Sequence, residues 1–213
     1  VELINLDLSH ADFSGADLRQ SRLGRTNFSH ANFRKTDLSE AILWGADLTA
    51  ADLRQAILRD ADLSGAKLIR TRLEEANLIK ASLCGANLNA VQLTGAVLIE
   101  VDLRPTSDQR TDLGRANLAG ADLSYANLSQ AFLKQANLDG AKLCRAILRC
   151  ETWRDAFVTD LSGASLCGAD LSYADLTGII LRDANLKGAD LTGTVLTKAD
   201  LEGAIMPDGE LHH

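Results

Sequence analysis

Residues 116–143 read ANLAGADLSYANLSQAFLKQANLDGAKL, and this stretch decides the fold. Divided every five residues, it repeats one pattern. Each repeat has a small residue first, Asp or Asn second in most cases, Leu third, and then two variable positions. The central Leu recurs at Leu118, Leu123, Leu128, Leu133, Leu138 and Leu143. The same frame starts at Leu3 and covers nearly the whole chain. A repeat at a fixed period constrains the architecture more than any local propensity does.

A period of five fits neither common secondary structure. On one α-helix, successive Leu residues would be rotated by about 140° and would form no apolar face. On one flat strand, they would alternate between the two faces, so half of them would face water. A chain that turns a corner after each short extended piece removes the conflict, because the Leu and the small residue two positions before it then both point inward.

Four such sides close a square coil of twenty residues. Coils stack through backbone hydrogen bonds at roughly 4.8 Å per rise. The small residue, usually Ala, is needed because the tube is narrow and must be filled without voids. The pattern resembles the pentapeptide-repeat family, which implies an all-β fold, the right-handed quadrilateral parallel β-helix. We therefore expect one domain over residues 1–213 with about ten coils.

Two breaks interrupt the frame. At Arg104–Asp112 (RPTSDQRTD), Asp108 takes a central position, but Leu103 and Leu113 stay ten residues apart, so we expect a polar outward loop. At Cys150–Asp160 (CETWRDAFVTD) the frame shifts, and we expect Trp153 and Phe157 of this insert to pack on the side of the rod or to form a contact point. After Pro207-Asp208-Gly209, which reads as a turn, the last residues are expected to form a short tail.

The composition narrows the function. The formal charge of −7 and a pI near 5.1 argue against nucleic-acid binding through a basic face. No apolar run is long enough to cross a membrane, and no signal peptide opens the chain. Cys84, Cys144, Cys150 and Cys167 form no CxxC pair, which favours a reducing, cytoplasmic setting. Nothing at the end of the chain offers a dimer surface, so a monomer is expected.

No catalytic constellation is visible, so the sequence predicts no enzyme, and no cofactor is implied. The glycines fit corners, where positive φ is cheap. The Asp and Asn residues fit backbone hydrogen bonding; twenty-residue arithmetic places Asp7, Asn27, Asp47, Asn87 and Asn127 on one side of the rod. His10 and His30 should stack on adjacent coils about 5 Å apart. With no further ligand nearby, surface histidines are favoured over a metal site.

Apolar residues at outward positions mark the candidate partner-binding surface. Contiguous exposed apolar surface of this kind is typical of interaction sites. The alternative is that another segment of the chain folds over it. The candidate residues are Trp44, Ile57, Ile79, Val97 and Ile99, with Arg104, Asp108 and Arg110 of the first loop.

The stretches that depart from the repeat carry a closer resemblance within the family. LSEAILWGADL around Trp44, TRLEEANLIKASLCGANLN from Thr71, LRPTSDQRTDLG from Leu103 and the ending AIMPDG are similar to members that regulate heterocyst differentiation in filamentous cyanobacteria. This resemblance implies binding to the transcription factor HetR and interference with its inhibition by a PatS-derived peptide.

Other family members mimic DNA and bind DNA gyrase, which is the alternative function. That mechanism needs unbroken acidic columns along the rod. Here Asp12, Asn32 and Asp52 are followed by Arg72, and Asp37 is followed by Ile57.

Overall fold

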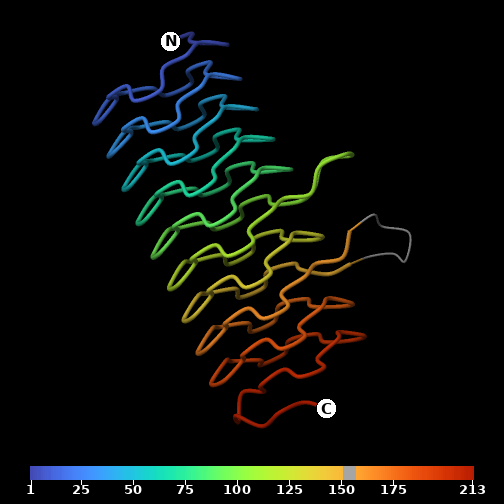
Figure 1. Ribbon diagram of the computed structural model, residues 1–213. Helices are drawn as coiled ribbons and strands as arrows, with labels where there is room; N and C mark the ends of the chain where they lie inside the picture. Colours follow the sequence, from blue (N-terminus) through green and yellow to red (C-terminus); the bar gives the residue numbers. More distant parts are fainter. Residues whose placement is uncertain (151–156) are drawn as a thin grey trace.

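The computed structural model describes residues 1–150 and 157–213 and shows a rod of stacked square coils (Figure 1). No residue in these two ranges is helical. The sheets consist of isolated parallel β-bridges, one per side of each coil, because the chain turns before an extended strand can form. Successive coils are joined by backbone hydrogen bonds, such as Leu23 N–H to the Ile42 carbonyl at 2.8 Å.

The bridges define four sides, numbered here in chain order. Within the described residues side 1 is crossed by ten coils, at Glu2, Arg22, Ile42, Asp62, Ser82, Asp102, Asn127, Ile147, Asp175 and Val195. Sides 2, 3 and 4 begin at Asp7, Asp12 and Asp17. Each bridging residue directly precedes the central residue of its pentapeptide, so its side chain points outward while the next one points into the tube.

Each corner is a tight turn closed by a hydrogen bond, for example from the Ala11 N–H to the Leu8 carbonyl at 3.2 Å. Positive φ occurs at the third residue of these turns, as at His10 with φ 62°, the pattern of a type II turn. Asp or Asn before the central residue accepts a further backbone hydrogen bond, as from Ser9 N–H to Asp7 Oδ1 at 3.1 Å. The predicted backbone-bonding role of these residues is therefore confirmed.

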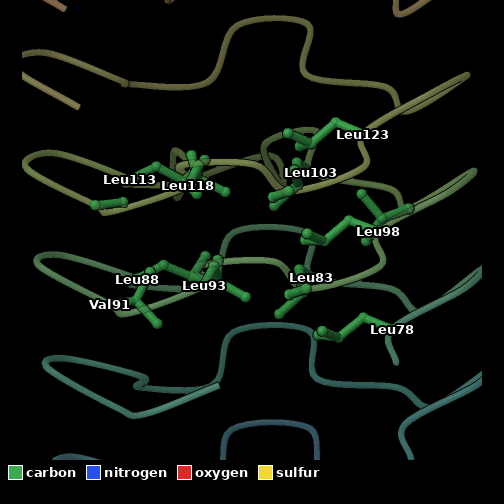
Figure 2. Packing of buried hydrophobic residues seen from close by; sticks show 14 of the residues in the cluster. Leu78, Leu83, Leu88, Val91, Leu93, Leu98, Leu103, Leu113, Leu118 and Leu123 are labelled. Atoms are coloured by element: carbon green, nitrogen blue, oxygen red, sulfur yellow. The ribbon is translucent and has the colours of Figure 1, made fainter. Parts of the chain in front are cut away.

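The core is one continuous column of Leu and Ala (Figure 2). Leu78 and Ala81 are fully buried, as are their equivalents throughout the middle of the rod. Near the first coils the Leu column gives way to a cluster of three phenylalanines. Phe13 and Phe33 stack with their centroids 4.9 Å apart, and Phe28 meets Phe33 edge-on at 5.2 Å. Leu and Ala thus fill the tube as the sequence predicts, with aromatic rings near the first coils.

Threonine replaces Ala at several inward positions without leaving its hydroxyl unsatisfied. Thr71 is fully buried, and its Oγ1 donates to the Leu48 carbonyl of the preceding coil at 2.7 Å. Thr36 donates in the same way to the Phe13 carbonyl at 2.7 Å. A buried hydroxyl without such a bond would destabilise the fold, so these bonds explain why a polar residue is accepted in the tube.

The first insert enlarges one coil from twenty to twenty-five residues, as the bridge from Asp102 to Asn127 shows. It leaves at the corner between sides 1 and 2, and Asp108 is exposed as predicted. The central Leu register survives, but every residue from there to the second insert lies one side earlier than twenty-residue counting predicts. Asn127 therefore lies on side 1, whereas Asn87 lies on side 2. The prediction that these two share a side was wrong, because it assumed a constant coil length.

The second insert leaves at the same corner, two coils further along. Ile147 lies on side 1 and Asp160 on side 2, and Asp160 pairs with Phe132, twenty-eight residues earlier. Phe157 is partly buried, whereas Trp153 lies outside the described residues.

The end of the chain folds back on the last coil. After the turn at Pro207–Gly209, Leu211 forms an antiparallel bridge with Ile205, and the His212 N–H donates to the Ala204 carbonyl at 2.8 Å. The predicted turn is confirmed, but the predicted tail is instead a hairpin that occupies hydrogen-bonding groups of the final coil.

Candidate partner-binding surface

Four of the predicted residues form a strip on side 4, which we call the apolar strip: Ile57, Ile79, Val97 and Ile99. The bridges from Ile57 to Asn77 and from Asn77 to Val97 place them on three successive coils. Ile57 is 37% exposed, and the other three are partly buried. On this side other coils carry Asp17 or Asp37 in the position of Ile57, so the strip is a local change from charged to apolar surface.

Trp44 lies on side 1 and packs closely on the preceding coil. A Cβ atom at Gly24 would come within 2.7 Å of the Trp44 indole nitrogen, so only glycine leaves room for this ring. The Arg25 guanidinium lies 4.3 Å from the indole centroid, a cation–π contact. Trp44 nevertheless remains 40% exposed, and Ile42 beside it is 38% exposed. The indole is therefore held against the preceding coil while part of it stays exposed.

A charged corner separates Trp44 from the apolar strip. It carries Glu40, Asp60, Lys80 and Glu100, all exposed. Lys80 and Glu100 lie 3.7 Å apart, within ion-pair distance. The structure therefore gives two apolar patches on adjoining sides rather than one continuous patch.

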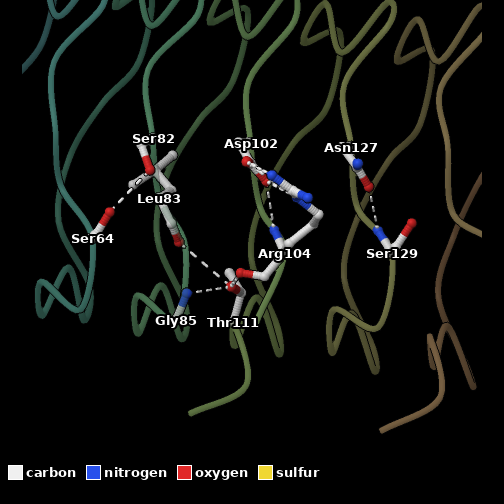
Figure 3. Close-up of polar contacts among 9 residues, drawn as sticks. All are labelled: Ser64, Ser82, Leu83, Gly85, Asp102, Arg104, Thr111, Asn127 and Ser129. Carbon is white, nitrogen blue, oxygen red and sulfur yellow. Dashed lines mark hydrogen bonds and ion pairs between the residues drawn. The ribbon is translucent and has the colours of Figure 1, made fainter. Parts of the chain in front are cut away.

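Arg104 and Asp108 of the first insert are exposed, and they lie at the edge of side 1 that faces away from the apolar strip. Arg104 binds Asp102 with both arms, Nε to Oδ1 at 3.0 Å and Nη2 to Oδ2 at 2.7 Å (Figure 3). Burial of Asp102 acts to raise the pKa of this carboxyl, but the hydrogen bonds from Arg104 outweigh it and the pKa is lowered. Among the described residues, Asp108 accepts hydrogen bonds from Thr106 and Ser107 alone, both at 3.2 Å, and its exposed carboxylate points outward.

Thr111 closes the base of this insert. Its buried Oγ1 donates to the Arg104 carbonyl and accepts from the Gly85 N–H, both at 2.8 Å (Figure 3). Thr159 plays the equivalent part at the second insert, where it donates to the Leu148 carbonyl at 2.5 Å and accepts from the Gln130 N–H at 2.7 Å. A Thr at the Ala position thus marks the return of each insert into the coil.

A hollow of about 380 Å³ lies beside the first insert. Cys84, Arg104, Pro105, Ser129 and Gln130 line it. Burial raises the pKa of the Cys84 thiol, so this thiol is less easily ionised than a free one. The hollow therefore offers shape rather than a reactive group.

Arg110 differs from the other residues of the insert, because its side chain extends along the rod to the next two coils. Its guanidinium donates to the carbonyls of Gln130 and Ala131, each at 2.8 Å, and to the Val158 carbonyl of the second insert. It also lies 5.0 Å from the Phe132 ring centroid and 5.7 Å from that of Phe157. Burial lowers the pKa of Arg110 despite nearby Asp160 and Asp112.

The predicted residues thus fall into three groups: the apolar strip, Trp44, and the first insert. The bond from Arg110 to the second insert was not predicted from the sequence. The repeat did carry a usable signal. Both inserts follow a side 1 pentapeptide, and counting the five extra residues of the first insert places the second insert at the same corner.

The other surface predictions concern histidines and acidic columns. The His10 and His30 rings stack with centroids 5.0 Å apart, as predicted. Across residues 1–150 and 157–213, no three His, Cys, Asp or Glu side chains lie close enough to hold a metal ion. The bridges Asp52–Arg72 and Asp37–Ile57 confirm that positive or apolar residues interrupt two of the acidic columns.

The repeat extends over almost all of this surface and its supporting coils. The family model for pentapeptide repeats matches residues 7–45, 46–83, 66–104, 111–149, 159–183 and 181–212. The chain belongs to the pentapeptide-repeat family. The right-handed quadrilateral β-helix implied by the sequence resemblance is thereby confirmed as its fold.

Among solved structures, this pentapeptide-repeat chain is similar to HetL, described as involved in regulation of heterocyst differentiation, from the cyanobacterium Nostoc sp. strain PCC 7120. The two share 65% sequence identity with a TM-score of 0.98, over 100% of this chain and 90% of that one. QnrB1, a plasmid-mediated fluoroquinolone resistance protein, shares 19% identity with a TM-score of 0.54, over 94% of this chain and 89% of that one. The second likeness shows the fold alone.

A search of curated proteins found no match. Among the described residues, the structure contains no helix with the length and apolar character needed to cross a membrane.

Proposed function

We propose that this chain is a monomeric, non-enzymatic interaction rod that regulates heterocyst differentiation in the cytoplasm by binding a HetR-type transcription factor. In this role it opposes inhibition of that factor by PatS-type peptide. The observation that carries the proposal is the 65% identity to HetL over the whole chain. Sharing the fold alone leaves a much lower identity, as the 19% shared with QnrB1 shows.

The proposed contact surface is the apolar strip together with Trp44, Arg104 and Asp108, with Arg110 holding the insert in place. Burying an apolar side chain of this size at the centre of an interface contributes about 1–3 kcal/mol. The fixed orientation of Trp44 lowers the entropy lost on binding. Because a charged corner separates Trp44 from the apolar strip, a partner in contact with both must wrap around that corner.

Calorimetric titration with a purified HetR-type factor tests this surface. The variant with Ile57→Ser, Ile79→Ser and Ile99→Ser should bind at least about ten-fold more weakly, since each change removes apolar contact. The matched control is Ser29→Ala with Asn89→Ala on side 2, opposite the strip, which should bind as the wild type does. Unchanged binding by the triple variant, with its thermal melt preserved, would exclude the apolar strip.

Competition tests the regulatory part of the proposal. When a HetR-type factor is inhibited by PatS-derived peptide, adding the rod should restore the binding of the factor to its DNA site. Restoration by the wild-type rod but not by the triple Ser variant is expected. If the wild-type rod binds the factor and restores nothing, the proposed opposition to the peptide is wrong.

DNA mimicry with gyrase as target is the alternative function. The interrupted acidic columns weigh against it. A gyrase supercoiling assay separates the two functions. A DNA mimic inhibits or protects gyrase, and the apolar strip takes no part in that effect.

A further inference from the structure

The corner between sides 4 and 1 changes character along the rod. In the earlier coils it carries polar residues that pair with each other, as Gln20 Nε2 does with Glu40 Oε2 at 2.9 Å. In the later coils the same position is taken by Tyr125, Arg145 and Tyr173, which we call the aromatic corner. Tyr125 and Tyr173 are the two tyrosines of the chain, and both lie at this corner.

Tyr173 is fixed in place although it is exposed. A Cβ atom at Gly193 would lie 2.7 Å from the ring, so the ring rests against this glycine. The Arg145 guanidinium lies 5.6 Å from the ring centroid. Tyr173 is still 58% exposed and Tyr125 is 53% exposed. Exposed tyrosines held in position are typical anchors of protein interfaces.

Arg145 is a charged residue of this corner whose guanidinium forms no ion pair with the described residues. Other arginines of the later coils are paired: Arg182 lies 2.5 Å from Asp200, and Arg149 lies 3.7 Å from Asp175. No carboxylate among the described residues lies within ion-pair distance of Arg145, whose guanidinium lies over the Tyr173 ring. A guanidinium exposed between two phenol rings is suited to a carboxylate, which it can bind with two parallel hydrogen bonds.

Two apolar side chains stand on side 1 beside this corner, on either side of Asp175, whose carboxylate is paired with Arg149 at 3.7 Å. Ile147, two residues after Arg145, is 36% exposed, and Val195, two residues after Gly193, is 45% exposed. Neighbouring coils lie roughly 4.8 Å apart, so Tyr125 and Tyr173, two coils apart, span about 10 Å. This is the span of about three residues of extended peptide.

We propose that the aromatic corner, with Ile147 and Val195, docks an acidic peptide segment of a protein partner. The segment lies extended along the rod, its carboxylate binds Arg145, and apolar residues on either side of it pack on the two tyrosines. Because the chain as a whole carries a net charge of −7, overall electrostatics repel an acidic segment, and the attraction is local to Arg145. This surface shares no residue with the apolar strip, so the proposal stands independently of the proposed function.

A phage-displayed library of short random peptides, selected on the immobilised wild-type rod, tests the proposal. Enrichment of peptides in which Asp or Glu stands between aromatic or aliphatic residues is expected. Enrichment of basic peptides, or of none, would overturn the proposal. Preferential binding of single-stranded DNA at this corner would also overturn it, because the corner would then recognise phosphate.

Calorimetry with the most enriched peptide then assigns the site. Arg145→Gln should weaken binding by about ten-fold or more, as should Tyr173→Asn. Both replacements tolerate the positive φ of this corner: Gln stands at such positions elsewhere, and Asn adopts them readily. Arg59→Gln is the matched control, an exposed arginine on side 4 without a neighbouring tyrosine. Equal affinity of Arg145→Gln and wild type, with unchanged circular dichroism, would refute the assignment.

Discussion

Arg110 gives the sharpest test of how the two inserts are held. Replacing Arg110 by Met keeps an unbranched apolar stem over Phe132 but removes all three hydrogen bonds to backbone carbonyls. Bonds from a charged donor contribute about 1.5–3 kcal/mol each when they are well shielded from solvent. At this half-buried position the freed carbonyls regain water, so we expect a net destabilisation of about 2–3 kcal/mol for the three together.

Urea unfolding monitored by circular dichroism measures the loss for Arg110→Met. Hydrogen exchange measured by mass spectrometry should also show faster exchange in residues 126–134 and at Thr159, because the bonds of Arg110 tie these segments together. Arg104→Met is the control on the same insert: Arg104 pairs with its neighbour Asp102, and its side chain is 57% exposed. An exposed pair of this kind contributes about 0–1 kcal/mol.

Equal losses of stability in Arg104→Met and Arg110→Met would refute this role of Arg110. An increase in exchange confined to the first insert would also refute it. Either result would mean that the insert is held by its own turn and by Thr111, without a contribution from the bond between the inserts.

Two further predictions concern the core and the first coil. Leu78→Asp should unfold several neighbouring coils together, since it places an unpaired charge in a dry tube at a cost of several kcal/mol; a thermal melt near that of the wild type would contradict the inward position of Leu78. Hydrogen bonds from Arg19 lower the pKa of Asp17 to about 2. The stabilisation by this pair should thus be complete above about pH 4 and lost as the pH falls through about 2, and Arg19→Gln should raise the pKa of Asp17 in an NMR titration of its carboxyl carbon.

The regular part of the fold follows from the sequence because its causes are local. The five-residue period decides which side chains point inward, as at Leu78 and Ala81, and the turn positions accept positive φ in residues as different as His10 and Gly15. The twenty-residue coil then places Ile57, Ile79, Val97 and Ile99 on one side of the rod by counting alone. These predictions hold because every contact within this region repeats at a constant interval.

Counting in twenties no longer places residues correctly after the first insert. Five extra residues preserve the Leu register but shift every residue between the two inserts by one side, so Asn127 lies on side 1 and not on the predicted side 2. The same shift brings the two inserts to one corner, where Arg110 bonds to both Gln130 and Val158. The fold-back of Leu211 onto Ile205 was likewise missed, since nothing in a short tail specifies its pairing partner.

The candidate surface divides in the same way. Sequence alone identified the outward apolar residues, because a side chain's direction depends only on its place in the pentapeptide. The tertiary structure decided that a charged corner separates Trp44 from the apolar strip and that Gly24 and Arg25 hold its indole. It also placed Arg145 against Tyr173, twenty-eight residues later in the chain. These contacts join different coils, and their partners depend on the length of everything between them, which the repeat does not determine once an insert has changed it.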